Sequence, residues 1–277
     1  MNKQLISSIV FIAFIFAACR PSGSDTAQSQ LQQARQLYEQ AHYGSAKTLL
    51  AELKKQHPKD YDIQKEALRL TREIDYQEQL RNRSFCDSVL LIGQMKAAEL
   101  KRSFVLEKTE YDHAGRYVDK LWNPSPELNG NYLKTSVDEW GEIVLTSAYR
   151  SDSPIGCNQL KVSIPSGEYA DTQVIPFDGG ANYRFKDGLG MTSETLTFQK
   201  GRDNGVIAFI ANHAAANIRL DYLGGKKTSF RMLFEIEKTA LNRTVELSAV
   251  LSSLEHIQKE KEKAEKRLNY LQEKLQK

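Results

Sequence analysis

The spacing of apolar residues changes along the chain, and each change marks a change in the expected secondary structure. Residues 59–103 contain no proline, and apolar side chains recur at every third or fourth position in Ile63, Ala67, Leu70 and Ile74 and again from Leu91. The seam positions between these two runs are polar: Gln77, Arg81, Ser84 and Ser88. The same spacing returns in residues 239–277, which lack both glycine and proline. This period is that of an amphipathic α-helix. The pattern therefore predicts two long helices, near 60–103 and 240–277, with the stretch 104–238 between them.

The C-terminal helix carries a heptad seam, which is typical of a coiled coil. The seam is interrupted once, by Lys261. In an antiparallel pairing Leu70 lies level with Leu271, and Lys261 lies near Arg81 and Asn82, so that polar layers meet. The expected seam of the first helix continues through Leu91, Met95 and Ala98, with Leu91 opposite Leu251 or Leu254. We therefore expect an antiparallel coiled-coil stalk; a homodimer through the C-terminal helix and two unpaired surface helices are the alternatives.

Between residues 104 and 238 the apolar period shortens to two. The segments "NIRLDYL" and "TSFRMLF" alternate apolar and polar residues, and Gly224-Gly225 between them indicates a tight hairpin. Further strands are expected in "EIVLTSAY", "LKVSI", "TQVI", "TLTF" and "VIAFIA", the last as a central strand because it is apolar on both faces. Short strands at this spacing predict an antiparallel β-sandwich or jelly-roll-like domain inserted between the helices. The fold class expected for the whole chain is α+β.

Residues 28–58 predict a helical hairpin. Apolar residues line one face of each half, Gly44 separates the halves and Pro58 ends the second. The residues that carry a resemblance to a tetratricopeptide hairpin are Tyr38, Tyr43, Ala46, Leu50 and Pro58. Stacked repeats need about three copies to share a core, and one copy is present. The hairpin is therefore expected to be a brace rather than part of a peptide-binding superhelix.

The N-terminus has the pattern of a secretory signal. Lys3 is followed by "LISSIVFIAFIFAA", about 14 largely apolar residues, which is shorter than the ~20 that a transmembrane helix needs. Ala17-Ala18 before Cys19 resembles the lipobox of bacterial lipoproteins, although Phe16 stands where leucine is usual. The resemblance implies a signal peptide over 1–18, cleavage before Cys19, and lipid on its thiol and new amino group, palmitate included.

Residues 19–27 are expected to be a flexible lipidated tether, because they are polar and contain serine and glycine. Several acyl chains anchor a protein stably to a membrane, whereas one does so only marginally. Arg20-Pro21-Ser22 lacks the aspartate that retains many lipoproteins at the inner membrane. The resemblance therefore implies an outer-membrane lipoprotein of the cell envelope that faces the periplasm.

Charge and motif content favour a noncatalytic protein. The 38 basic and 35 acidic residues are interleaved, so no single-sign stripe attracts nucleic acid. The five histidines lack the spacing of a zinc site, and no nucleophile-elbow, P-loop or complete dinucleotide motif occurs, so no metal or cofactor is expected. Asp112-His113 and Asp138-Glu139 are interpreted as loop charges, because adjacent side chains on a strand point to opposite faces.

Two small sets of residues are candidates for a site. Trp122, Trp140, Tyr117 and Tyr132 lie near expected turns, where aromatic rings could stack on sugars as in sandwich-type carbohydrate-binding modules, which this domain resembles in architecture only. Packing within the domain is the other use of such rings. Cys86 and Cys157 could form a disulfide in an oxidising periplasm or remain separate thiols.

The leading functional hypothesis is a membrane-anchored scaffold. In it, a noncatalytic envelope lipoprotein presents the β-domain on the coiled-coil stalk to an envelope protein partner. The alternatives are a glycan-binding envelope lipoprotein and an envelope enzyme whose site no local motif reveals. Cys19, as the site of lipid attachment, is the one residue to which the sequence assigns a definite role.

Overall fold

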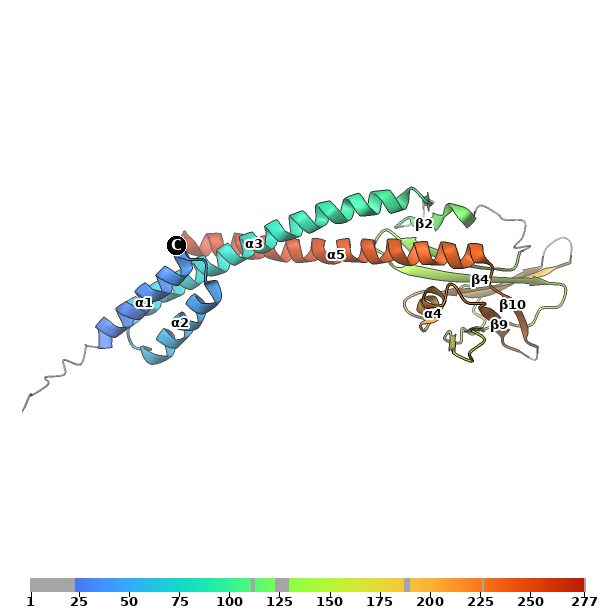
Figure 1. The fold of residues 1–277 in the computed structure, drawn as a ribbon, viewed down its shortest axis with the longest axis horizontal. Coiled ribbons are helices and arrows are strands. Elements are labelled where there is room, and N and C mark those ends of the chain that lie inside the picture. The colour runs from blue at the N-terminus through green and yellow to red at the C-terminus, as the bar shows by residue number, and fades with distance from the viewer. Residues whose placement is uncertain (1–22, 111–112, 123–129, 187–189, 226, 277) are drawn as a thin grey trace, which may run out of the picture. The chain divides into compact units, whose positions relative to one another are not determined.

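A computed structural model describes residues 23–110, 113–122, 130–186, 190–225 and 227–276 (Figure 1). Within these residues there are five α-helices and two antiparallel sheets, which confirms the mixed class. Cys19 and the signal segment lie outside them, as does Asp112. The chain divides into two compact units, of which the first comprises Met1–Asn82 with Ala264–Lys277 and the second comprises Arg83–Lys263. None of the described helices combines the length and the hydropathy of a transmembrane segment.

The first unit is built on α1 (Gly23–Glu39), α2 (Tyr43–Gln56) and the beginning of α3 (Tyr61–Lys101), which lie side by side in Figure 1. Asp60 precedes α3, and its carboxylate accepts a hydrogen bond from the backbone N–H of Ile63 at 3.3 Å, as a helix cap does. The apolar faces of the three helices share one cluster: Ala27, Leu31, Ala34, Ala46, Leu50, Leu53, Ile63, Ala67, Leu70 and Ile74.

Helix α5 (Glu235–Leu275) contacts α3 in both units. In the first unit Arg267 pairs with Asp75 at 3.3 Å, where the predicted register places Asp75 level with Leu268. In the second unit Lys96 pairs with Glu246 at 3.4 Å. A second contact in each unit, Arg72 with the carbonyl of Lys274 at 3.5 Å and Lys261 with Asp87 at 2.7 Å, shows that α3 and α5 are antiparallel within each unit. The coiled-coil stalk as a whole stays a prediction.

The predicted seam of α3 is wrong in its residues. Leu91 and Met95 are 61% and 68% exposed, whereas Leu90 and Ala97 are buried. A Cβ added to Gly93 would lie 2.7 Å from Leu254, so the glycine lets the two helices approach closely. The buried face of α3 here thus contains Leu90 and the small residues that permit close packing, whereas Leu91 and Met95 lie outside it.

In the first unit the apolar residues of α3 that were expected to face α5 pack against the α1–α2 hairpin instead. Ala67, Leu70 and Ile74 are buried in the cluster with α1 and α2, of which Leu268 and Leu271 are not members. Within the second unit Lys261, the predicted interruption of the seam, pairs with Asp87 of α3 at 2.7 Å. In the first unit the apolar stripe of α3 therefore packs against the α1–α2 hairpin.

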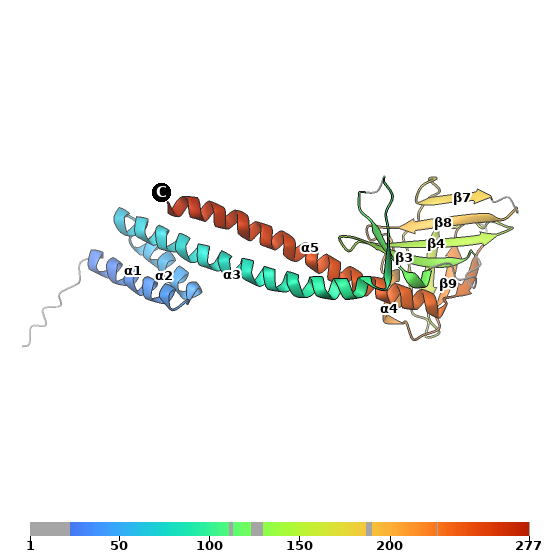
Figure 2. The ribbon, with the colours of Figure 1, turned by 90° about the horizontal axis from the view of Figure 1, so that it is seen from above.

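The second unit contains two antiparallel sheets. Figure 2 shows β7, β8, β4 and β3 of the larger sheet as successive neighbouring strands. The six-stranded sheet has the order β1 (Phe104–Glu107), β2 (Arg116–Asp119), β3 (Tyr132–Asp138), β4 (Ile143–Ser151), β8 (Thr192–Phe198) and β7 (Asn182–Lys186). The four-stranded sheet has the order β10 (Ser229–Met232), β9 (Arg219–Leu223), β5 (Gln159–Ser163) and β6 (Tyr169–Asp171). The hairpin predicted at Gly224-Gly225 joins β9 to β10.

Both sheets bury side chains in one core, to which Leu145 and Phe198 contribute from the larger sheet and Leu160 and Tyr222 from the smaller. The segment "VIAFIA", expected to be a central strand, is instead α4 (Val206–Asn212). Its apolar residues suit a short helix as well as a strand, and Val206, Ile207 and Ile210 enter the core on helical spacing. "TQVI" forms no strand, although Ile175 is buried.

A separate cluster fastens both long helices to the larger sheet within the second unit. Its members are Ala97 of α3, Phe104 of β1, Val137 of β3, and Leu247 and Leu251 of α5. Two residues separate α3 from β1, and two separate β10 from α5. The helices therefore join the β-sheets without a flexible linker.

Candidate ligand-binding surface

Trp122 and Tyr132 lie together at one end of the larger sheet. Trp122 ends the short 3₁₀ helix η1 (Lys120–Trp122), and Tyr132 begins β3. Their ring centroids are 6.1 Å apart, with the planes inclined at 59°. Burial raises the pKa of the Tyr132 phenol. The indole N–H of Trp122 is buried and has no hydrogen-bond acceptor within the described structure.

Trp140 lies at the opposite end of β3, in the turn that leads to β4. Because β3 has seven residues, the two ends are about 20 Å apart. Trp140 is 51% exposed. Its turn is held on α5, since the Ser248 hydroxyl donates to the carbonyl of Gly141 at 2.6 Å and a Cβ on Gly141 would clash with Ser252. The two tryptophans therefore do not form one site.

Tyr117 has a packing role in β2. Its ring packs against the cluster that joins the helices to the sheet. The ammonium of Lys101 lies 4.6 Å from the ring centroid, a cation–π contact with the end of α3. Of the four aromatic residues proposed from the sequence, the structure brings only Trp122 and Tyr132 together.

Tyr132 begins a row of paired residues that crosses four strands. It pairs with Ala148 of β4, which pairs with Thr195 of β8, which pairs with Tyr183 of β7. Directly paired residues point to the same face of a sheet, so two tyrosines stand on one face about 14 Å apart with two small residues between them. Phe185 stacks beside Tyr183, with ring centroids 6.5 Å apart.

We name Trp122, Tyr132, Tyr183 and Phe185 the aromatic row. Tyr183 and Phe185 are 37% and 52% exposed and lie on the edge strand β7. The sequence interpretation missed both residues. The available signal was the alternation of Tyr183 and Phe185 about Arg184, after the turn at Asp178-Gly179.

Behind the aromatic row, a buried carboxylate holds the edge strand in place. Glu194 of β8 is 2% exposed and pairs with Arg184 of β7 at 2.7 Å. It also accepts hydrogen bonds at 2.8 Å from the backbone N–H groups of Ile155 and Gly156. A charge without such partners would be costly to bury. The carboxylate thus ties β7, β8 and the segment before β5 into one rigid support.

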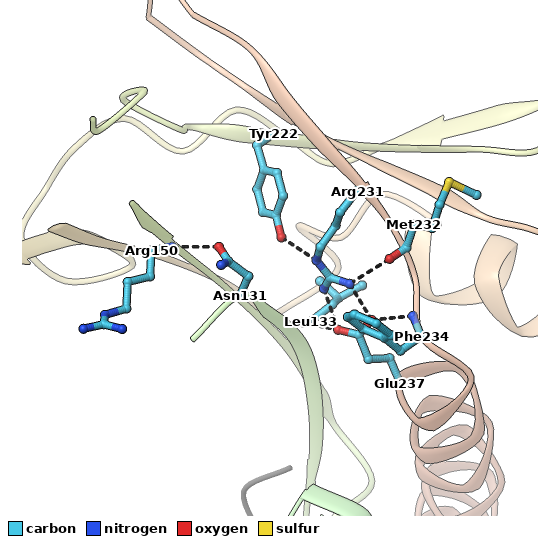
Figure 3. A network of polar contacts seen from close by, with 8 residues as sticks. All are labelled: Asn131, Leu133, Arg150, Tyr222, Arg231, Met232, Phe234 and Glu237. Atoms are coloured by element: carbon cyan, nitrogen blue, oxygen red, sulfur yellow. Dashed lines mark hydrogen bonds and ion pairs between the residues drawn. The ribbon is translucent and has the colours of Figure 1, made fainter. Parts of the chain in front are cut away.

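A second buried carboxylate connects α5 to both sheets (Figure 3). Glu237, the third residue of α5, pairs with Arg231 of β10 at 2.5 Å and accepts from the N–H groups of Leu133 and Phe234 at 2.7 and 2.8 Å. Burial opposes the charge on Arg231, but its bonds to Glu237 raise the pKa of the guanidinium. Arg231 also donates to the Tyr222 hydroxyl at 2.9 Å.

The acidic residues and cysteines singled out in the sequence have packing or loop-shaping roles. Asp138 accepts from the N–H groups of Trp140 and Glu142, and Glu139 accepts from that of Gly115, so these carboxylates shape loops. Cys86 and Cys157 are both buried and are not joined by a disulfide. Within the described residues, no group of three or more histidine, cysteine or acidic side chains could hold a metal ion.

No family model, no curated protein and no solved structure matches the chain.

Proposed function

We propose that this chain is a noncatalytic, lipid-anchored lipoprotein of the cell envelope that presents its β-sheets on a coiled-coil stalk for protein interaction or scaffolding. The cluster of Ala97, Phe104, Val137, Leu247 and Leu251 is the observation that carries the proposal. Closely packed apolar residues resist relative movement. A sheet clamped to the ends of two 41-residue helices suits presentation, because its orientation follows that of the helices.

The lipid anchor rests on the lipobox resemblance at Cys19. Cys19→Ser removes the thiol that would carry the diacylglycerol. We expect the wild-type chain in the membrane fraction and the variant, uncleaved at this site, without incorporated palmitate. Metabolic labelling with palmitate followed by mass spectrometry of the N-terminal peptide tests this. An unmodified Cys19 in the wild-type chain would contradict the anchor.

The stalk is supported by the antiparallel ion pairs between α3 and α5. Asp75 and Arg267 lie 3.3 Å apart and belong to the same unit. We expect Asp75→Cys with Arg267→Cys to crosslink within one chain when a short bifunctional maleimide is added, and Asp62→Cys with Arg267→Cys to serve as a mismatched control. Crosslinked dimers instead of monomers would favour the homodimer through the C-terminal helix.

Glycan binding is the second candidate, and the aromatic row favours it. Its rings lie on one face of a supported sheet, where they can stack on the apolar faces of sugars. In a Trp140→Phe variant, Trp122 alone reports by fluorescence. We expect its emission to respond to at least one of a panel of soluble oligosaccharides, and Tyr132→Ala to weaken that response. Tyr169→Ala, which removes a 59% exposed ring elsewhere, is the control. An unresponsive Trp122 would remove the support for this candidate.

A further inference from the structure

An open groove lies between α2 and α3 in the first unit. Its volume is about 640 Å³, and its lining residues are Lys47, Leu50, Ala51, Lys54, Gln64, Lys65, Ala67, Leu68 and Thr71. On each helix these residues recur at helical spacing, so each helix turns one continuous face to the groove. The floor contains Leu50 and Ala67, which are buried, and Leu68, which is 50% exposed. The groove is therefore an apolar channel along two helices.

The groove lies where the next helix of a stacked helical array would pack. The hairpin α1–α2 packs against the start of α3, as successive helices do in a stacked helical array. In such an array the following helix would cover the exposed faces of α2 and α3. Here α3 continues for 41 residues instead of turning back. Among the residues that the structure describes, none fills the place of a fourth helix beside α2 and α3.

The charged residues that line the groove are all lysines. Three lysines, Lys47, Lys54 and Lys65, line it, and no carboxylate does so among the described residues. Lys47 is already paired with Asp75 and Glu78, each at 2.8 Å. In the part of the chain that the structure describes, Lys54 and Lys65 form no ion pair. These two ammonium groups can therefore pair with carboxylates of another molecule.

We propose that this groove binds an amphipathic α-helix of a partner protein, whose apolar stripe is flanked by glutamate or aspartate. The small side chains of Ala51 and Ala67 leave room for larger apolar side chains of that helix. Lys47 and Lys54 are seven residues apart, or about 10 Å along α2, which corresponds to roughly two turns of the bound helix. Burial of the stripe supplies affinity, and the lysines select acidic over basic helices.

Two designed peptides test the proposal against the full chain. Both are capped, fluorescently labelled helices of three heptads with the same apolar stripe; one has glutamate beside the stripe and the other has lysine. We expect the acidic peptide to bind at least about tenfold more tightly than the basic one at low salt. Fluorescence anisotropy measures both affinities.

Substitutions in the groove test whether the peptide binds there. Lys54→Glu with Lys65→Glu should weaken the acidic peptide at least about tenfold and improve the basic one. Lys55→Glu with Lys59→Glu, which reverses two charges outside the groove lining, is the matched control. Leu68→Ala should also weaken binding, whereas Leu91→Ala, at a 61% exposed position of the second unit, should not.

Four outcomes overturn the proposal. One is the absence of acidic-peptide binding at about 1 mM, and another is equal affinity for the two peptides. A third is binding that the lysine reversals leave unchanged. The fourth is occupation by something else: either binding to vesicles containing phosphatidylglycerol, lost in the lysine variant while peptides do not bind, or self-association that Leu68→Ala abolishes.

Discussion

At the scale of single residues, two nearly buried carboxylates, Glu194 and Glu237, hold the second unit together. The side chain of each is 1% exposed. Each pairs with one arginine and accepts hydrogen bonds from two backbone N–H groups. Removal of one partner from such a pair costs more than the pair itself contributes, because the other charge stays buried. These residues therefore support the two sheets.

Glu237→Ala should destabilise the chain strongly. It leaves the guanidinium of Arg231 without its carboxylate and the N–H groups of Leu133 and Phe234 without an acceptor. The expected loss in the free energy of unfolding is about 3–5 kcal/mol, measured by urea denaturation. Arg219→Ala, which removes a half-exposed side chain over Phe230, should cost under about 1 kcal/mol. Equal losses would contradict a special role for the buried pair.

Cys157 should react slowly as long as the chain is folded. Burial raises the pKa of its thiol to about 12, so roughly one molecule in ten thousand carries the thiolate at pH 8. We expect iodoacetamide to label Cys157 in urea but hardly at all in native buffer, as read by peptide mass spectrometry. Rapid native labelling at pH 8 would contradict the burial of this thiol.

The same shift has a consequence for stability. Between the ordinary pKa of 9.0 and the folded value of about 12, the folded chain holds a proton at Cys157 that the unfolded chain has lost. The free energy of unfolding should therefore fall as the pH rises through this window. Cys157→Ala should show a smaller fall than the wild type over the same range.

At the scale of elements, helix α3 shows how packing selects among several apolar positions. Residues 85–98 carry apolar side chains on more than one face, so their spacing alone does not identify the buried one. Gly93 and Ala97 decide it, because small residues allow close approach to α5 and the sheet. Helix α4 illustrates the same limit, since a short run of apolar residues suits a strand or a helix equally.

The corrected face of α3 can be tested with adjacent leucines. Leu90 is 8% exposed and Leu91 is 61% exposed. Leu90→Ala should lower the free energy of unfolding by about 2–5 kcal/mol, because it opens a cavity. Leu91→Ala should change it by less than about 0.5 kcal/mol. Thermal and urea denaturation measure both; the reverse order would restore the seam through Leu91, Met95 and Ala98.

At the scale of the whole molecule, each unit has its own apolar core. The first has the helical cluster around Leu31, and the second has the cluster shared by the two sheets. Helices α3 and α5 contribute residues to both units. The two clusters share no residue, so the cores can be perturbed separately.

Leu31→Ala should destabilise the first unit selectively. Leu31 is 1% exposed, so the truncation should cost about 2–5 kcal/mol. We expect faster amide hydrogen exchange in α1 and α2, with β4 and β8 unchanged. Leu160→Ala, at a fully buried position of the sheets, should produce the opposite distribution. Uniformly faster exchange in both variants would indicate a single cooperative unit.

Local periodicity determined much of this protein from its sequence alone. Repeats of three to four residues and of two residues predicted the long helices, most strands, the Gly224-Gly225 hairpin and the mixed class, because those periods reflect backbone geometry within a segment. Only the tertiary structure decided which face of α3 is buried, that "VIAFIA" is a helix, and that Trp122 meets Tyr132 but not Trp140. It alone revealed Tyr183 in the aromatic row and the lysine-lined groove. Each of these features depends on contacts between residues distant in the chain, which no local period encodes.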